Sequence, residues 1–163
     1  MRCVVVILDG VLRPATHPDG VDPVGRQLYE ALRQQFRVVL LDQAAAVDAE
    51  HWLGVHSIAG YARAYTPPAD FAPQTVAEGR LRLLAAIRNA DGADLVIEPD
   101  PECAAEEIRA GYTVMLYASP QYLLDIWHPD HPREPRAWDA IVDEIERQHT
   151  AKSLDARLKE TDD

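Results

Sequence analysis

Short runs of apolar residues, many of them β-branched, each followed by an acidic residue, constrain this chain more than any other feature. The runs with their acids are Cys3–Leu8 before Asp9, Phe36–Leu41 before Asp42, and Leu95–Ile97 before Glu98. The first run is unbroken and the second contains one charged residue, Arg37, near its start. Short apolar runs of this kind are typical of strands buried on both faces. Segments with helical spacing of apolar residues lie between them, and that alternation predicts an α/β domain with a parallel sheet.

The remaining elements follow from apolar spacing and from turn residues. We expect helices from Pro23 onward, over Ala44–Trp52, over Gln74–Asn89, over Glu102–Ala110 and around Trp138–Ile145, with further strands over Ala62–Tyr65 and Tyr112–Tyr117. This order predicts one three-layer, doubly wound, Rossmann-like α/β domain with a mainly parallel sheet over residues 1–149. Residues 150–163 are mostly polar and are expected to form a tail or a frayed helix end.

In the last helix, the apolar side chains Trp138, Ile141, Val142 and Ile145 are expected to face the core. Ahead of that helix, four prolines between positions 120 and 135 favour an irregular crossover.

Charge and composition narrow the function classes. Lys and Arg total 16 against 27 Asp and Glu, a net charge of −11 that would repel nucleic acid, so no nucleic-acid groove is expected. Two cysteines 100 positions apart form no disulfide framework. No apolar run is long enough for a membrane span, and the first strand begins at once. We therefore expect a cytoplasmic protein.

The acidic residues that close the strands are candidate site residues. Ligands of open parallel sheets bind beyond the carboxyl ends of the strands, where Asp9, Asp42, Glu98 and Asp100 would converge. Converging carboxylates repel one another unless a cation joins them or some take up protons, and Mg²⁺ is one such cation. Acids at strand-to-helix junctions also serve as helix N-caps, as Asp42 would for a helix from Ala44.

Two motifs resemble the haloacid dehalogenase-like (HAD) superfamily, most of whose members are Mg²⁺-dependent phosphohydrolases. Val4–Leu12, with its Asp9-Gly10-Val11-Leu12, resembles the opening motif Asp-x-Asp-Gly-Thr-Leu/Val. Leu95–Pro101, followed by a helix ending in Ala110-Gly111, resembles the acidic fourth motif. The match covers residues 3–118. The short connections imply a capless core with an open crevice.

The opening motif departs from the family at its catalytic positions. Aligning Asp9-Gly10 on the family's Asp-Gly puts Asp9 at the general acid/base position and Ile7 at the nucleophile. Isoleucine has no lone pair with which to attack phosphorus. In the alternative register, Asp9 becomes the nucleophile and Val11 takes the acid/base position. Either register breaks the catalytic pair.

The resemblance also implies roles at the other motifs. Asp42 stands where the second motif has Ser or Thr, and it lines the phosphate crevice with Gly10. Arg80 is the best match to the third-motif lysine, although it also suits a solvated helix arginine. The metal ligands would be Asp9, Glu98 and Asp100, holding Mg²⁺. The catalytic positions would be Asp9 and Arg80.

Two weaker candidates lie outside these motifs. His128 and His131 have a spacing that suits a pair of metal ligands, but the prolines around them favour an irregular loop. Cys103 lies near a helix start, where thiol pKa values can fall, but neighbouring acids oppose the thiolate and favour a structural cysteine.

Three hypotheses follow. The first is a HAD-like domain that has lost phosphohydrolase chemistry and acts in binding, regulation or assembly, with a protein partner or by self-association. The second is a Mg²⁺-dependent phosphatase or nucleotidase with rearranged acids, in which a metal-activated water is the nucleophile. The third is a structural or virion-associated protein, in which the crevice plays no part and the final helix makes the contacts. The chain also resembles small HAD-like proteins of actinobacterial phages, and that resemblance implies a location in the host cytoplasm or the virion.

Overall fold

The computed structural model describes residues 2–14, 17–118 and 137–154, and these form an α/β domain around a five-stranded, all-parallel sheet. The strands are β1 (Cys3–Ile7), β2 (Arg37–Leu41), β3 (Arg63–Tyr65), β4 (Leu95–Glu98) and β5 (Val114–Leu116). Their spatial order is β3-β2-β1-β4-β5. The predicted parallel, Rossmann-like α/β class is thus confirmed, including the short strand within Ala62–Tyr65.

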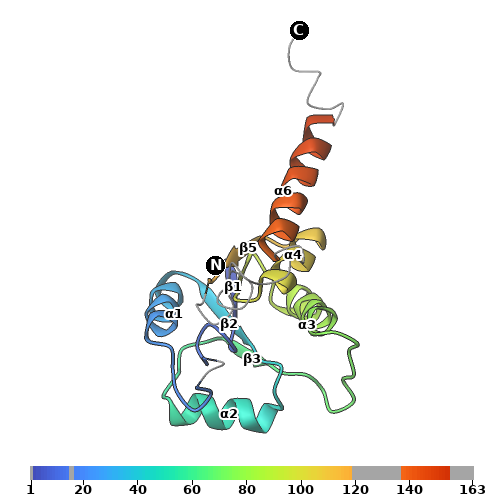
Figure 1. Cartoon of the computed structure of the whole chain (residues 1–163). Coiled ribbons are helices and arrows are strands. Elements are labelled where there is room, and N and C mark those ends of the chain that lie inside the picture. Colours follow the sequence, from blue (N-terminus) through green and yellow to red (C-terminus); the bar gives the residue numbers. More distant parts are fainter. Residues whose placement is uncertain (1, 15–16, 119–136, 155–163) are drawn as a thin grey trace, which may run out of the picture.

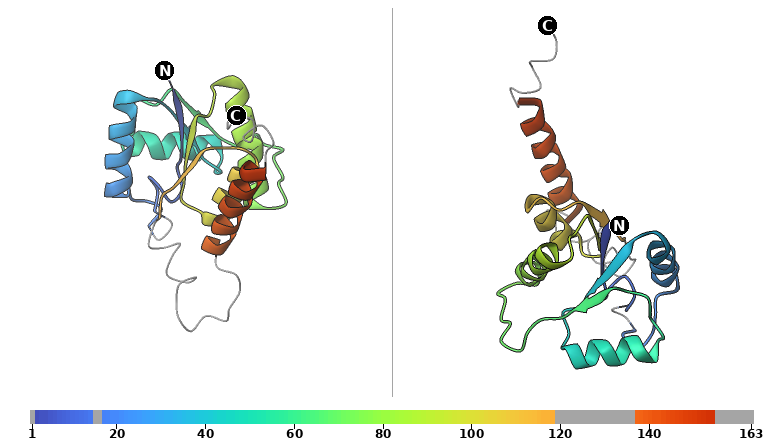
Figure 2. Two further views of the ribbon diagram at one scale, coloured as in Figure 1. Left: turned by 90° about the horizontal axis from the view of Figure 1, so that it is seen from above. Right: turned by 180° about the vertical axis from the view of Figure 1, so that it is seen from behind.

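The helices cover the sheet from both sides. They are α1 (Pro23–Gln35), α2 (Ala46–Val55), α3 (Val76–Ala90), α4 (Pro101–Arg109) and α6 (Ala137–Leu154). In Figures 1 and 2, α1 lies on one side of the sheet, while α3 and α4 lie on the other. Helix α2 runs across the end of the sheet at which β2 finishes (Figure 1). Two layers of helices therefore enclose the strands, as the sequence predicts for a doubly wound fold.

Strand β1 is the centre of the core because it is the middle strand of the five-stranded sheet. It pairs in register with β2 from Cys3 opposite Arg37 to Ile7 opposite Leu41, and with β4 from Val4 opposite Leu95. All five of its side chains are buried. Burying a side chain such as Val or Ile contributes roughly 1.5–3 kcal/mol, so this strand fixes the register of its neighbours.

The loop after β1 folds back on itself before α1 begins. The amide of Leu12 donates to the Leu8 carbonyl at 3.0 Å, and Gly10, with φ of +87°, turns the chain where a side chain would be strained. Helix α1 then packs so closely that a Cβ on Gly25 would lie 1.7 Å from the Val11 carbonyl oxygen. The loop is therefore held against both the strand and the helix.

Helix α6 packs against α4 and then extends away from the body of the domain (Figures 1 and 2). Ile141 is buried against α4, as expected, and Trp138 packs there partly buried. Val142 and Ile145 are 46% and 54% exposed, so the expectation that both face the core is wrong. Among the described residues, α4 makes the main contact with this helix, and Val114 and Leu116 of β5 pack in the same cluster.

Candidate functional site

The carboxyl ends of the central strands carry two groups of charged side chains. We call Asp9, Arg13 and Asp42 the β1/β2 cluster, and Arg80, Glu98 and Glu107 the β4 cluster. The first group follows β1 and β2, whereas Glu98 is the last residue of β4 and its two partners come from α3 and α4. The acids therefore do gather at this edge, and an arginine accompanies each group.

In the β1/β2 cluster, one guanidinium joins two carboxylates. Arg13 donates from Nη1 to Asp9 Oδ1 at 2.9 Å and from Nη2 to Asp42 Oδ2 at 2.8 Å. The remaining Asp42 oxygen accepts the Ala44 amide at 2.9 Å. Asp42 is almost fully buried, and the Asp9 side chain is 44% exposed. Arg13 thus supplies the cation that converging carboxylates require.

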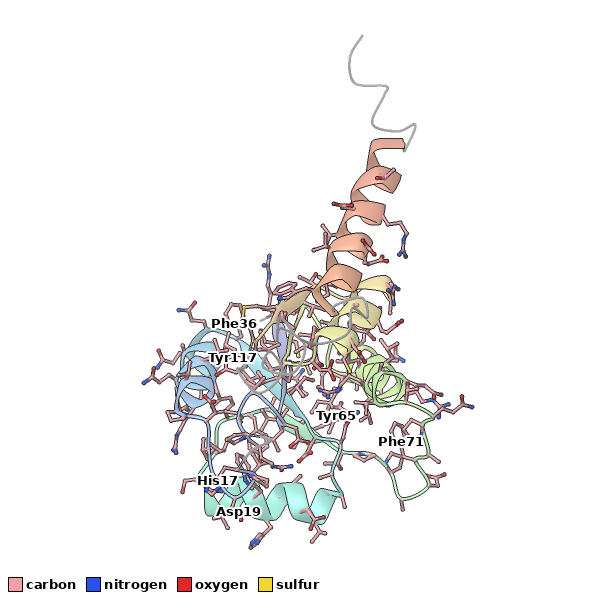
Figure 3. All side chains as sticks on the ribbon, in the orientation of Figure 1. His17, Asp19, Phe36, Tyr65, Phe71 and Tyr117 are labelled. Atoms are coloured by element: carbon pink, nitrogen blue, oxygen red, sulfur yellow. The ribbon has the colours of Figure 1, made fainter. Side chains whose placement is uncertain are left out.

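The guanidinium of Arg13 also contacts Trp52 of helix α2. Its Cζ lies 5.0 Å from the centroid of the Trp52 ring, a distance at which a cation is attracted to the face of an aromatic ring. The Trp52 Nε1 donates to the Pro18 carbonyl at 2.9 Å, and the neighbouring loop residues His17 and Asp19 lie beside α2 in Figure 3. Trp52 of α2 therefore contacts both Arg13 and the loop after β1 at this end of the sheet.

Asp42 does not cap α2, contrary to expectation. The helix begins at Ala46, and its N-cap position is Ala45, which makes no side-chain cap. The Asp42 amide instead donates to the Tyr65 carbonyl at 2.9 Å and continues the pairing of β2 with β3. Since the Asp42 oxygens already accept from Arg13 and Ala44, none is directed at the first turn of the helix.

The electrostatic environment of Asp9 differs from that of a simple surface acid. Burial raises the pKa of Asp9, the nearby Asp42 charge raises it further, and Arg13 and Arg80 oppose both effects. The charges of two arginines therefore act on this one carboxylate. Gly10, the other predicted crevice residue, is buried in the turn and contributes its conformation there.

The β4 cluster is buried much more deeply. Arg80 Nη1 lies 3.1 Å from Glu98 Oε2, with the two side chains 5% and 0% exposed. The interpretation of Arg80 as a solvated helix arginine is therefore wrong. The other Glu98 oxygen accepts the amide of Asp100 at 2.8 Å. This pairing removes Glu98 from the surface and joins α3 to the end of β4.

Glu107, like Arg13, is a residue of these clusters that the sequence motifs did not predict. It is fully buried, and within the described ranges neither of its oxygens accepts an N–H or O–H. Burial raises the pKa of Glu107 well above its ordinary value, and the adjacent Glu98 raises it further. A raised pKa favours the protonated form of Glu107, whose O–H Glu98 could accept. The cluster thus places two carboxyl groups beside one arginine.

Asp100 acts as a helix cap. Its Oδ1 accepts the amides of Glu102 at 2.8 Å and Cys103 at 3.4 Å at the start of α4. Cys103 is buried, and burial followed by the charge of Glu98 raises the pKa of its thiol. The structural interpretation is therefore confirmed for Cys103, and the N-cap alternative is confirmed for Asp100. His128 and His131 lie outside the described residues.

The carboxylates as placed do not fit a Mg²⁺ site. Within residues 2–14, 17–118 and 137–154, no group of three or more His, Cys, Asp or Glu is placed to hold a metal ion. Both oxygens of Asp42 and of Glu98 are engaged by an arginine or a backbone amide. One oxygen of Asp9 accepts from Arg13, and one oxygen of Asp100 accepts the first amides of α4. We therefore derive no catalytic step through a metal at this edge.

Comparison with known proteins assigns this chain to no family, so the structure identifies its fold class alone. No protein-family model matches the chain, and no curated protein matches it either. The class that the strands and helices define is an α/β domain with a Rossmann-like, all-parallel sheet. None of the helices in the described part of the chain is long and apolar enough to cross a membrane.

Proposed function

We propose that this chain is a HAD-like domain without phosphohydrolase chemistry that acts by binding or assembly. The observation that carries the proposal is Ile7, the last residue of β1, which is only 1% exposed and packs in the core. Aligned on the HAD opening motif, this is the nucleophile position. In the alternative register, Val11 would supply the general acid/base, and it is also buried and apolar.

The charges around Ile7 support the same proposal. A phosphohydrolase crevice needs groups free to receive a phosphate and a cation, whereas Arg13 holds both Asp9 and Asp42. Arg80, aligned with the phosphate-binding lysine, is buried against Glu98. Each arginine is therefore engaged by an acid of this chain, and the alternative of a rearranged Mg²⁺-dependent hydrolase would require both pairs to open.

The test is turnover of a phosphomonoester such as p-nitrophenyl phosphate in the presence of millimolar Mg²⁺, the cation that a hydrolase of this kind would use. We expect no hydrolysis above the rate of an Asp9→Asn variant. Hydrolysis that Asp9→Asn abolishes would overturn the proposal and favour the rearranged hydrolase. Ile7→Asp is the companion variant, and hydrolysis gained there would show that only the nucleophile is missing.

The binding or assembly role has an observation of its own in α6. This helix extends beyond the body of the domain (Figure 1). Its Val142 and Ile145, three positions apart, are exposed. We expect a Val142→Ser/Ile145→Ser variant to lose any self-association seen by analytical ultracentrifugation. The matched control is Val47→Ser/Val55→Ser, which alters two valines exposed on α2. An oligomer that survives the α6 change would place the contact elsewhere.

A further inference from the structure

We infer that Arg13 is the built-in cation of the Asp9–Asp42 carboxylate pair, and that its guanidinium closes this pair to divalent metal ions. The inference deepens the proposed function, on which it rests, because it gives a physical reason why the edge of the sheet that would hold a metal is inactive. It concerns one side chain and the two carboxylates that it joins.

Arg13 is fixed in place by three kinds of contact. Its backbone amide donates to the Leu8 carbonyl at 2.9 Å, and its carbonyl accepts the Gly10 amide at 2.7 Å. Its guanidinium bonds both carboxylates, and its flat face lies over Trp52. The side chain is only 12% exposed. Since backbone and side chain are both held, the guanidinium is a resident group of the fold.

The guanidinium occupies the position that a shared metal would need. It bonds Asp9 at 2.9 Å on one side and Asp42 at 2.8 Å on the other, so it lies between the two carboxylates. A Mg²⁺ or Mn²⁺ ion bound by both groups would have to take that place. Asp42, which is 2% exposed, would also have to exchange an arginine for a hydrated ion.

Charge favours the same assignment. One arginine and two carboxylates leave a net charge of −1, and the charge of Arg80 also favours an ionised Asp9. If Arg13 were removed, the two carboxylates would face each other without that cation, and a divalent ion would then be the natural replacement. The pair is therefore a latent cation site whose occupant is part of the chain.

The experiment measures thermal unfolding once with Mn²⁺ and once with EDTA. The Mn²⁺ concentration is about 10 mM, on the order of ten times a millimolar Kd, so that a weak two-carboxylate site would be occupied. We expect no Mn²⁺-dependent shift for the wild-type protein. Arg13→Gln should unfold at a lower temperature in EDTA and regain about 4 °C in Mn²⁺. Arg13→Gln/Asp42→Asn should show no gain, because one ligand is lost.

Arg33→Gln is the matched control, since it removes one positive charge from an exposed pair with Glu30 on α1. It should respond to Mn²⁺ as the wild type does. A folded Arg13→Gln protein that is as indifferent to Mn²⁺ as this control would overturn the inference.

A direct titration of the wild-type protein with Mn²⁺, followed by water-proton relaxation, keeps the test decisive if Arg13→Gln does not fold. No binding at millimolar Mn²⁺ supports the inference. Binding that Asp42→Asn abolishes overturns it. Mn²⁺ binding by the wild type without phosphomonoester hydrolysis would overturn the inference and leave the proposed function standing. Hydrolysis that does not depend on Mn²⁺ would overturn the proposed function and leave the inference intact.

Discussion

The β1/β2 cluster and the β4 cluster meet the same electrostatic problem in different ways. In the first, two carboxylates share Arg13 through short hydrogen bonds, and Asp9 still reaches solvent. In the second, Glu98 and Glu107 are fully buried with Arg80, whose Nε and Nη1 make no hydrogen bond within the described residues. One cation reduces the charge of the first pair to −1, whereas in the second pair the raised pKa of Glu107 favours a proton beside the cation.

The comparison shows that burial decides which solution is available. Near solvent, two carboxylates can stay ionised around one arginine because water screens the residual charge. In a dry site, a second ionised carboxylate would cost several kcal/mol, so protonation is the cheaper state. The β1/β2 cluster should therefore respond to added cations only when Arg13 is removed, and the β4 cluster should respond to pH.

The largest expected effect comes from removing the cation of the buried cluster. Arg80→Met leaves Glu98 buried and unpaired, and breaking a buried pair in this way costs roughly 3–5 kcal/mol of unfolding free energy. Urea denaturation measures the loss. The control is Arg82→Met on the same helix, α3. The ion pair of Arg82 with Glu78 is exposed and contributes roughly 0–1 kcal/mol. Equal losses in the two variants would contradict the assignment of Arg80 as a buried partner.

The next effect is a pH dependence carried by Glu107. Its folded pKa is raised by burial and by Glu98, so its stabilising contribution is complete below its unfolded pKa and is lost as pH rises toward the folded pKa. Between pH 6 and 8 the unfolding free energy should fall with a slope of up to about 1.4 kcal/mol per pH unit.

Glu107→Gln keeps a buried polar group of the same shape without the titration, so we expect its stability to change less over that range. The other ionisable groups near the Glu107 carboxyl are Arg80, Glu98, Asp100, Cys103 and Tyr112. All of these remain in the variant. Parallel pH profiles for the wild type and the variant would show that Glu107 is not the group that takes up the proton.

A smaller effect separates the two acids of the β1/β2 cluster. Asp42→Asn removes the charge that Arg13 bonds in a nearly dry position and should cost about 1–3 kcal/mol. Asp9→Asn changes a carboxylate that is 44% exposed, and its loss should stay below about 1 kcal/mol. Chemical denaturation of both variants at pH 7 makes the comparison. A larger loss from Asp9→Asn would reverse the ranking that burial gives.

The sequence predicted the strands well because their signals are local. The β-branched run from Cys3 and the run before Asp42 identify buried strands without any knowledge of their partners. The gathering of acids at one edge followed from the parallel topology alone. What could not be predicted is which charge each acid would meet, because Arg13 and Asp42 are 29 positions apart.

Two sequence signals for the missed residues existed nevertheless. Arg13 is the only Lys or Arg between Leu8 and Asp22, so it is the one cation that this loop brings to the strand ends. Glu107 lies among Cys103, Ala104 and Ile108 at helical spacing, which places an acid on the apolar face of α4. Neither pattern says that the side chain is buried, since that depends on how α3 and α4 pack.

The smallest expected effect tests whether Asp100 belongs to the charged clusters or only to α4. Asp100→Ala removes an N-cap that accepts two amides and should cost about 1 kcal/mol, whereas Asp100→Asn should be nearly neutral because Asn caps equally well. If the role of Asp100 depended on its carboxylate charge, both variants would lose the same unfolding free energy. Urea denaturation at pH 7 separates the two, because Asn keeps the acceptor oxygen and removes only the charge.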